Sequence, residues 1–306
     1  MLSRVANNLC WLGRYLERTE NTARLISVNA NLLLDLPKVI VLGWEPIVEI
    51  VSGHDEFYAL HDKADEKSVI HFMVSEEAYP GSILKSLEFA RENARTIREI
   101  IPREVWEQIN ELYLFAKENG HKSLQRRSRY EFLTEIIESI QKITGILSGT
   151  MTHDEGYQFL RIGRNLERAD MTTRIIDVRS ASLLQETETE QAAFENLQWM
   201  SVLKSLTAYQ MYRREVRLRI RRPDVLKFLL LEEKFPRSLS HTFGQVKHCV
   251  QALPNSANVV AAIGAVEAQL HNANPQRLIQ DKLHEFIDDM QFGIIEVFNQ
   301  LEQTYF

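Results

Sequence analysis

Cysteine is scarce in this sequence, which contains only Cys10 and Cys249 among its 306 residues. The two residues form no CxxC motif and no spacing that is typical of metal ligands. A disulfide framework or a cysteine-rich zinc site is therefore not expected. We interpret both thiols as small, buried, apolar side chains.

Long apolar runs are also missing. No uncharged apolar stretch approaches the roughly 18 to 20 residues that a bilayer-spanning helix needs. Arg4, Arg14, Glu17 and Arg18 interrupt any apolar core near the start, which argues against a secretory signal. We therefore expect a cytoplasmic protein with no membrane association.

The sequence has no strong charge of one sign, because its formal net charge is only -6. This gives no general electrostatic reason to bind nucleic acid, and no nucleic-acid partner is expected. The arginine-rich run YRREVRLRIRRP at 212–223 has no interleaved aromatic platform. We interpret it as a solvated helix end, with a phosphate or acidic-partner site as the alternative.

The familiar motifs of catalysis are absent as well. The sequence contains no GxSxG, no glycine-rich phosphate loop after a strand, and no nucleophile with a local base. His241 and His248 are two helical turns apart, about 10 Å, which is too far for one metal ion without a third element. Asp281 and His284 fall off the apolar seam of their helix. We expect no metal site and no cofactor, and no catalytic residue is assigned.

What the sequence does contain is helical periodicity. Between residues 5 and 33, apolar side chains recur at alternating steps of three and four, as on the core face of a long helix. Proline and glycine divide residues 37–80 into short helices. A capping box, THDE at 152–155, is predicted to open a second long helix, and ETETEQ at 186–191 is predicted to be a solvated connection. Further helices are predicted at 82–97, 104–119, 129–148, 199–216, 224–231, 237–252, 256–271 and 276–303. The expected fold class is all-α, a multi-helix bundle.

One segment of the first long helix occurs again in the second. LGRYLERTENTARLI at 12–26 matches IGRNLERADMTTRII at 162–176 with eight of fifteen positions identical. The repeat predicts an internal duplication within a single domain at 1–306. Its two related halves, roughly 1–150 and 151–306, would meet around a pseudo-two-fold axis.

The repeat carries a charged stripe beside its apolar seam. Steps of four, three and four place the stripe residues of each helix on one face. A glycine within a helix costs about 1 kcal/mol relative to alanine, so its occurrence at the same place twice suggests close approach by a neighbouring helix. The adjacent charges would then be partly buried and would need partners. The charged stripe consists of Gly13, Glu17, Glu20 and Arg24 in the first helix and Gly163, Glu167, Asp170 and Arg174 in the second.

The charged stripe allows three interpretations. It is an ion network that sets helix register, or it lines a pocket for an amino acid, a peptide end or an acyl phosphate. In the third, the protein is an enzyme that transfers an acyl or aminoacyl group and uses one carboxylate as general base. The candidate ligand-binding residues of the stripe are Glu17, Glu20, Arg24, Glu167, Asp170 and Arg174.

Four blocks of sequence together resemble the bacterial Alpha-E domain family. The blocks are MLSRVANNLCWLGRYLERTENTARL at the start, FARENARTIRE at 89–99, GTMTHDEGYQFLRIGRNLERADMTTRIIDV at 149–178 and FLLLEEKFPRSL at 228–239. The resemblance implies an all-helical protein encoded beside a circularly permuted ATP-grasp protein, often with a transglutaminase-like protein and sometimes with a proteasome-like peptidase. It also implies a part in making or modifying peptides through amide bonds. We therefore expect a helical accessory or substrate-binding protein that acts with the ATP-grasp ligase. The positions that match the family add four supporting candidates for ligand binding, Arg14, Arg91, Arg95 and Arg164.

Overall fold

Helices form every regular element in the part of the chain that the structure describes. The computed structural model describes residues 1–35, 43–181, 188–216, 220–279 and 281–306, and no strand occurs in these ranges. The expected all-α fold class is confirmed. None of the described helices is long and apolar enough to cross a membrane. The chain divides into two compact units, Met1–Arg164 (unit 1) and Asn165–Phe306 (unit 2).

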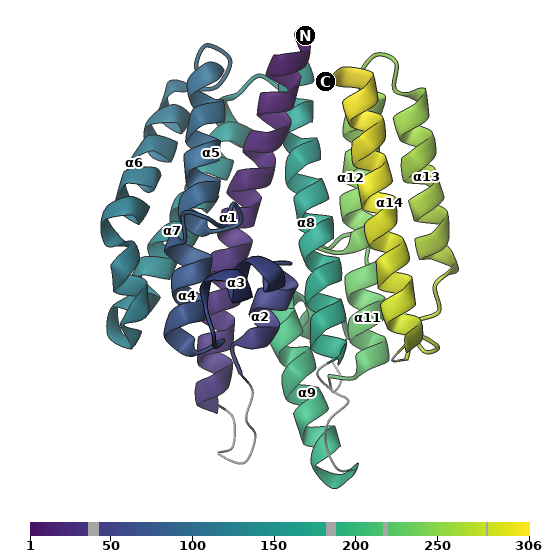
Figure 1. Ribbon diagram of the computed structural model, residues 1–306. Helices are drawn as coiled ribbons and strands as arrows, with labels where there is room; N and C mark the ends of the chain where they lie inside the picture. Colours follow the sequence, from purple (N-terminus) through teal and green to yellow (C-terminus); the bar gives the residue numbers. More distant parts are fainter. Residues whose placement is uncertain (36–42, 182–187, 217–219, 280) are drawn as a thin grey trace. The chain divides into compact units, whose positions relative to one another are not determined.

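Four long helices form the body of unit 1. They are α1 (Ser3–Asp35), α5 (Ile83–Thr96), α6 (Arg103–Asn119) and α7 (Arg126–Thr150). α1 packs against α5 and α7, and each of these packs against α6, so that the four helices close a ring (Figure 1). Their apolar seams explain the arrangement, because each helix buries one face between its two neighbours.

Short helices cover this bundle. They are α2 (Glu45–Ile50), α3 (His54–Leu60), α4 (Glu66–Ser75) and the 3-10 turn η1 (Gly120–Leu124). α4 begins where the Asp65 carboxylate accepts hydrogen bonds from the backbone N–H groups of Lys67 and Ser68, both at 2.9 Å. The short helices predicted between residues 37 and 80 are therefore present from residue 43 onward. Residues 36–42, with Pro37 as the predicted stop of the first helix, lie outside the described residues.

The second long helix, α8 (Glu155–Ala181), has a different N-cap residue from the predicted one. The Asp154 carboxylate accepts hydrogen bonds from the backbone N–H groups of Gly156 at 2.9 Å and Tyr157 at 3.3 Å. The prediction that Thr152 forms the cap is therefore wrong. Asp154 is the nearer acceptor, since an N-cap side chain reaches the N–H groups two and three residues onward.

The two glycines of the repeat mark a close contact within unit 1. A Cβ atom on Gly13 would overlap with the carbonyl oxygen of Leu160 and would lie 3.0 Å from the backbone nitrogen of Arg164. A Cβ atom on Gly163 would overlap with the carbonyl oxygen of Cys10. The expected close backbone approach is thus present between α1 and the first part of α8. The contact is reciprocal, because Gly13 and Gly163, like Cys10 and Leu160, are 150 residues apart.

Unit 2 contains the rest of α8 and six further helices. α11 packs against α9 and α12, and α13 packs against both α12 and α14. The helices are α9 (Glu188–Ser205), α10 (Tyr209–Val216), α11 (Arg222–Leu231), α12 (Leu239–Gln251), α13 (Ala257–Asn272) and α14 (Asp281–Tyr305).

Two sequence predictions about unit 2 are wrong. The single helix predicted over 199–216 is two helices, because Thr207 adopts a φ of 52° and ends α9 before α10 begins. The connection predicted at 186–191 is helical from Glu188 onward. Residues 186 and 187, and Arg217 and Arg219 of the arginine-rich run, lie outside the described residues.

Candidate functional site

The charged stripe of α1 is buried. Glu17 is 2% exposed and Glu20 is 6% exposed. Arg24 donates from Nε and Nη2 to the same carboxylate oxygen of Glu20, both at 2.8 Å, one helical turn along. The guanidinium of Arg14 lies 4.7 Å from the ring centre of Trp11. The expected burial and the expected carboxylate–arginine pairing are both found.

The charged stripe of α8 has the same local pairing. Asp170 accepts a hydrogen bond from Nε of Arg174 at 2.8 Å, again over four residues. Glu167 is 2% exposed, while Arg164, the last residue of unit 1, is half-buried. In both repeated segments, therefore, a carboxylate pairs with the arginine four residues later in the same helix.

Arg91 and Arg95 lie on α5 and are held elsewhere. Arg91 donates to the side-chain oxygen of Asn110 on α6 at 2.7 Å, and its guanidinium lies 5.3 Å from the ring centre of Tyr113. Arg95 is more than half exposed and pairs with Glu92 of its own helix at 3.0 Å. These contacts direct Arg91 toward α6 rather than toward the Glu20–Arg24 pair.

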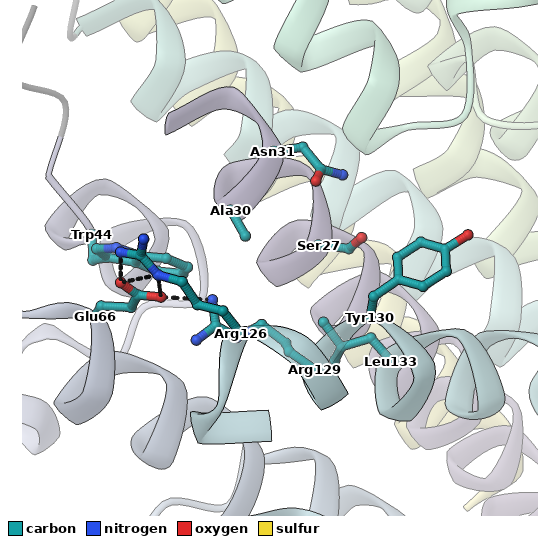
Figure 2. Close-up of a pocket in the computed structure, with 9 residues that line it drawn as sticks. All are labelled: Ser27, Ala30, Asn31, Trp44, Glu66, Arg126, Arg129, Tyr130 and Leu133. Carbon is teal, nitrogen blue, oxygen red and sulfur yellow. Dashed lines mark hydrogen bonds and ion pairs between the residues drawn. The ribbon is translucent and has the colours of Figure 1, made fainter. Parts of the chain in front are cut away.

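A pocket in unit 1 lies where the charged stripe of α1 continues. Ser27 and Asn31 follow Arg24 at the next steps of three and four, and both face this pocket of about 200 Å³ (Figure 2). We call it the Arg129 pocket. It is lined by Ser27, Ala30, Asn31, Trp44, Glu66, Arg126, Arg129, Tyr130 and Leu133.

One carboxylate holds two arginines in the wall of the Arg129 pocket. Arg126 donates from Nη2 to Oε2 of Glu66 at 2.6 Å and from Nε to Oε1 at 3.1 Å (Figure 2). Nη1 of Arg129 lies 2.8 Å from Oε1 of Glu66. The hydrogen bonds from Arg126 are the largest cause that lowers the pKa of Glu66 below its ordinary value of 4.5, followed by those from Arg129. Glu66 therefore stays ionised at neutral pH.

Arg129 is the unusual member of this group. Its side chain is 6% exposed, whereas that of Arg126 is 74% exposed. Nε of Arg129 donates to the carbonyl oxygen of Ser123 at 2.7 Å, and the guanidinium lies 5.8 Å from the ring centre of Trp44. The remaining nitrogen, Nη2, is buried and has no hydrogen-bond partner among the described residues. A buried charged donor without a partner costs free energy, so an acceptor that reached Nη2 would lower that cost.

Sequence reasoning did not single out Arg129 or Glu66. A signal for Arg129 was available, because it falls in the spacing of the α7 seam, followed by Leu133, Ile136 and Ile140. An arginine at a seam position is predicted to be buried and to need a partner. Glu66 gave no such signal, since it lies 63 residues away in the first turn of a short helix, where an acid is expected in any case.

A second titratable cluster lies in unit 2. Nδ1 of His284 on α14 lies 2.7 Å from a carboxylate oxygen of Asp177 on α8, and Nε2 lies 3.6 Å from Asp288. The hydrogen bond to Asp177 raises the pKa of His284 above its ordinary value of 6.5. The cluster is thus an ion pair between a protonated imidazole and two carboxylates.

This ion pair should make the stability of unit 2 depend on pH. Because the pKa of His284 is higher in the folded state, its contribution is fully present below pH 6.5 and is lost as the pH rises through the folded-state pKa. His284→Gln should therefore destabilise the protein at pH 6 and have little effect at pH 9, as measured by thermal denaturation. Equal losses at both pH values would contradict this account.

The fold and this site define a class: an all-helical protein whose first unit is a four-helix bundle with a small charged pocket. A family model, Alpha-E, described as a predicted alpha-helical domain with a conserved ER motif, matches residues 1–306. The chain belongs to the Alpha-E family. The dipeptide Glu-Arg occurs at 17–18 and 167–168, within the two repeated segments, and nowhere else in the sequence.

The chain is also similar to longer proteins from mycobacteria. It is 23% identical over 300 residues, 90% of its length, to the uncharacterised proteins Mb2597 of Mycobacterium bovis and MT2643 and Rv2567 of Mycobacterium tuberculosis. The chain spans about a third (33%) of the length of these curated relatives. No solved structure matches it.

Proposed function

We propose that this chain binds a small ligand with a free carboxylate, of the amino-acid or peptide class, for a circularly permuted ATP-grasp ligase that forms or modifies amide bonds. One observation carries the binding part. Arg129 is buried in a pocket wall, and its Nη2 has no partner within the described ranges of the chain. The ligase part of the proposal rests on the resemblance of the four sequence blocks to Alpha-E proteins.

The chemistry of the Arg129 pocket favours a carboxylate. Two arginines face one glutamate, so the wall carries a net positive charge, and a guanidinium donor suits a carboxylate oxygen. Trp44 and Tyr130 add aromatic surface against which the carbon skeleton of a ligand can pack.

The size of the pocket limits the ligand. A volume of about 200 Å³ lies below the roughly 300 to 1,000 Å³ of typical ligand pockets. The small volume favours one amino acid or one end of a peptide over a whole nucleotide. The proposed ligand is therefore a carboxylate-bearing building block rather than ATP itself.

A negative charge introduced at the pocket should weaken binding. Asn31 is exposed and lines the pocket, so Asn31→Asp changes charge with little risk to folding. We expect affinity for free amino acids or dipeptides to fall at least about tenfold, equivalent to about 1.4 kcal/mol. Isothermal titration calorimetry with each dipeptide and its C-terminal amide measures both the affinity and the need for the carboxylate.

Gln141→Glu provides the matched control. Gln141 is exposed on α7, the helix that carries Arg129, and lies eight residues beyond Leu133, the last pocket residue of that helix. The same charge change there should leave affinity unchanged. If acids and amides bound equally, or if both variants bound like the wild type, the carboxylate assignment would be wrong.

The ligase partnership needs a separate experiment. The chain and the ATP-grasp protein encoded beside it should co-purify, and amide formation should require both. Amide formation by the chain alone would instead favour the acyl-transfer enzyme. If the two proteins neither bind nor affect each other's activity, the ligase part fails, while ligand binding at the Arg129 pocket is judged by calorimetry.

A structural role is favoured for the charged stripe itself. Glu20 and Arg24 already pair within α1, and Asp170 and Arg174 already pair within α8. Gly13, at the start of the charged stripe, is committed to a close backbone contact. These observations support the interpretation that the charged stripe sets helix register, which is the best attested use of buried charge pairs.

A further inference from the structure

Two histidines and a glutamate come together at the ends of α3 and α4 in unit 1. They are His61, which ends α3, His71 within α4, and Glu76, which ends α4. One ligand atom from each lies within 4.8 Å of the others. We call these residues the His61 cluster. It is separate from the Arg129 pocket, because Glu66 begins α4 and Glu76 ends it, about 15 Å away along the helix.

The His61 ring is packed among aromatic side chains. Its centre lies 4.9 Å from that of Phe57 and 6.4 Å from that of Phe72. Nε2 of His61 is buried and has no hydrogen-bond partner in the part of the chain that the structure describes. A buried imidazole nitrogen in apolar surroundings calls for an acceptor, a donor or a metal ion. His71 and Glu76 each place a ligand atom within 4.8 Å of a nitrogen of this ring.

Glu76 is held in place by its surroundings. One carboxylate oxygen accepts a hydrogen bond from the backbone N–H of Ala78 at 3.1 Å. The backbone N–H of Glu76 donates to the carbonyl of His71 at 3.1 Å, and its own carbonyl accepts from the Ser82 hydroxyl at 2.9 Å. Such supporting hydrogen bonds orient a carboxylate ligand before a metal arrives. The other oxygen, Oε2, lies 3.7 Å from Nδ1 of His71.

These distances suit a small divalent cation. Tetrahedral zinc with ligand bonds of about 2.0 to 2.1 Å places neighbouring ligand atoms about 3.4 Å apart. The 3.7 Å between His71 and Glu76 is already close to that value, and a small side-chain rotation would bring in His61. Two imidazoles and one carboxylate are a ligand set that zinc uses when a fourth position holds water.

We propose that His61, His71 and Glu76 bind a divalent transition-metal ion of the zinc type. His71 is nearly half exposed, so the ion can enter from solvent and keep a water ligand at its fourth position. The metal would tie the end of α3 to the end of α4.

The Asp177, His284 and Asp288 group in unit 2 has a similar composition but lacks the main argument. Both nitrogens of His284 already face carboxylates, Nδ1 at 2.7 Å and Nε2 at 3.6 Å. A protonated imidazole explains that arrangement without a metal, whereas Nε2 of His61 has no such explanation. The observations therefore favour the His61 cluster.

The test is direct metal binding by the full chain after treatment with a chelator. Competition with a chromophoric zinc indicator should show one Zn²⁺ bound per chain. Co²⁺ in the same site should give the visible absorption of a four-coordinate ion. His61→Ala should weaken Zn²⁺ binding by more than about tenfold. Glu76→Gln should do the same and preserves side-chain shape, which covers the case in which His61→Ala folds poorly.

His54→Ala is the matched control, since His54 lies on α3, is exposed and pairs with its neighbour Asp55 rather than with the cluster. It should bind Zn²⁺ like the wild type. The proposal is overturned if the wild type binds no Zn²⁺. It is also overturned if His61→Ala and Glu76→Gln bind normally while His284→Ala does not, because the metal would then occupy unit 2.

Discussion

Replacement of Gly163 by alanine is expected to destabilise unit 1 by about 3 kcal/mol, the upper end of the usual cost of overpacking. An alanine Cβ at this position would overlap with the carbonyl of Cys10, a backbone group that no side-chain rotation can move. α1 and the first part of α8 would have to separate, which would loosen the fully buried Leu9, Leu12 and Ile162. The gain in helix propensity, about 1 kcal/mol from glycine to alanine, offsets only part of this cost.

Gly145→Ala is the control for that experiment. Gly145 lies within α7 of the same unit, and a Cβ there would meet nothing within 4 Å. This variant should be as stable as the wild type or more stable by up to about 1 kcal/mol. Urea denaturation with hydrogen exchange of the α1 amides gives a local measurement, which is needed because two units need not unfold together. A Gly163→Ala protein with wild-type exchange in α1 would show that the helices do not approach so closely.

The second large effect is expected at Glu66. Glu66→Gln keeps the shape of the side chain but leaves the buried guanidinium of Arg129 without its carboxylate. Breaking a buried pair on one side costs about 3 to 5 kcal/mol, and we expect about 2 to 3 kcal/mol because Glu66 is 24% exposed. Chemical denaturation at pH 7 measures the loss.

Arg126→Gln removes the other arginine from the same carboxylate and should have a much smaller effect. Arg126 is largely exposed, and exposed ion pairs contribute little. The pH dependence provides a further check. Because the pKa of Glu66 is lowered in the folded state, its stabilisation is present above pH 4.5 and is lost as the pH falls through the folded-state pKa. Glu66→Gln should therefore lose less stability than the wild type on acidification, and equal acid sensitivity would contradict this assignment.

The sequence predicted most helices because their apolar seams are long and regular. The close approach of two helices at Gly13 and Gly163 followed from the cost of glycine within a helix, and the contact is present. The internal duplication stays a prediction, supported by the reciprocity of that contact. The predicted helix boundaries were wrong at two places, and a single residue is responsible in each case. Asp154 took the cap predicted for Thr152, and Thr207 ended α9 within a predicted helix.

The Arg129 pocket and the His61 cluster could not be predicted in the same way. Both join residues from short helices between 43 and 80, where proline and glycine remove the periodicity that locates a face. Glu66 meets Arg129 only through tertiary packing. Six of the ten candidate residues were chosen for their spacing along long helices and the other four for the family resemblance. Neither criterion detects a partner on a short helix.

The reciprocal glycine contact has one more consequence. Gly13 lies against the backbone of α8 at Leu160, and Gly163 lies against the backbone of α1 at Cys10. Equivalent positions of the two repeated segments therefore make equivalent contacts. This is the geometry of an isologous interface, which two identical subunits form around a two-fold axis, although here a single chain supplies both sides. Each glycine makes room for the backbone of the opposite helix. Such a self-complementary contact excludes a side chain at either glycine, because the obstacle in both cases is the backbone of the opposite helix.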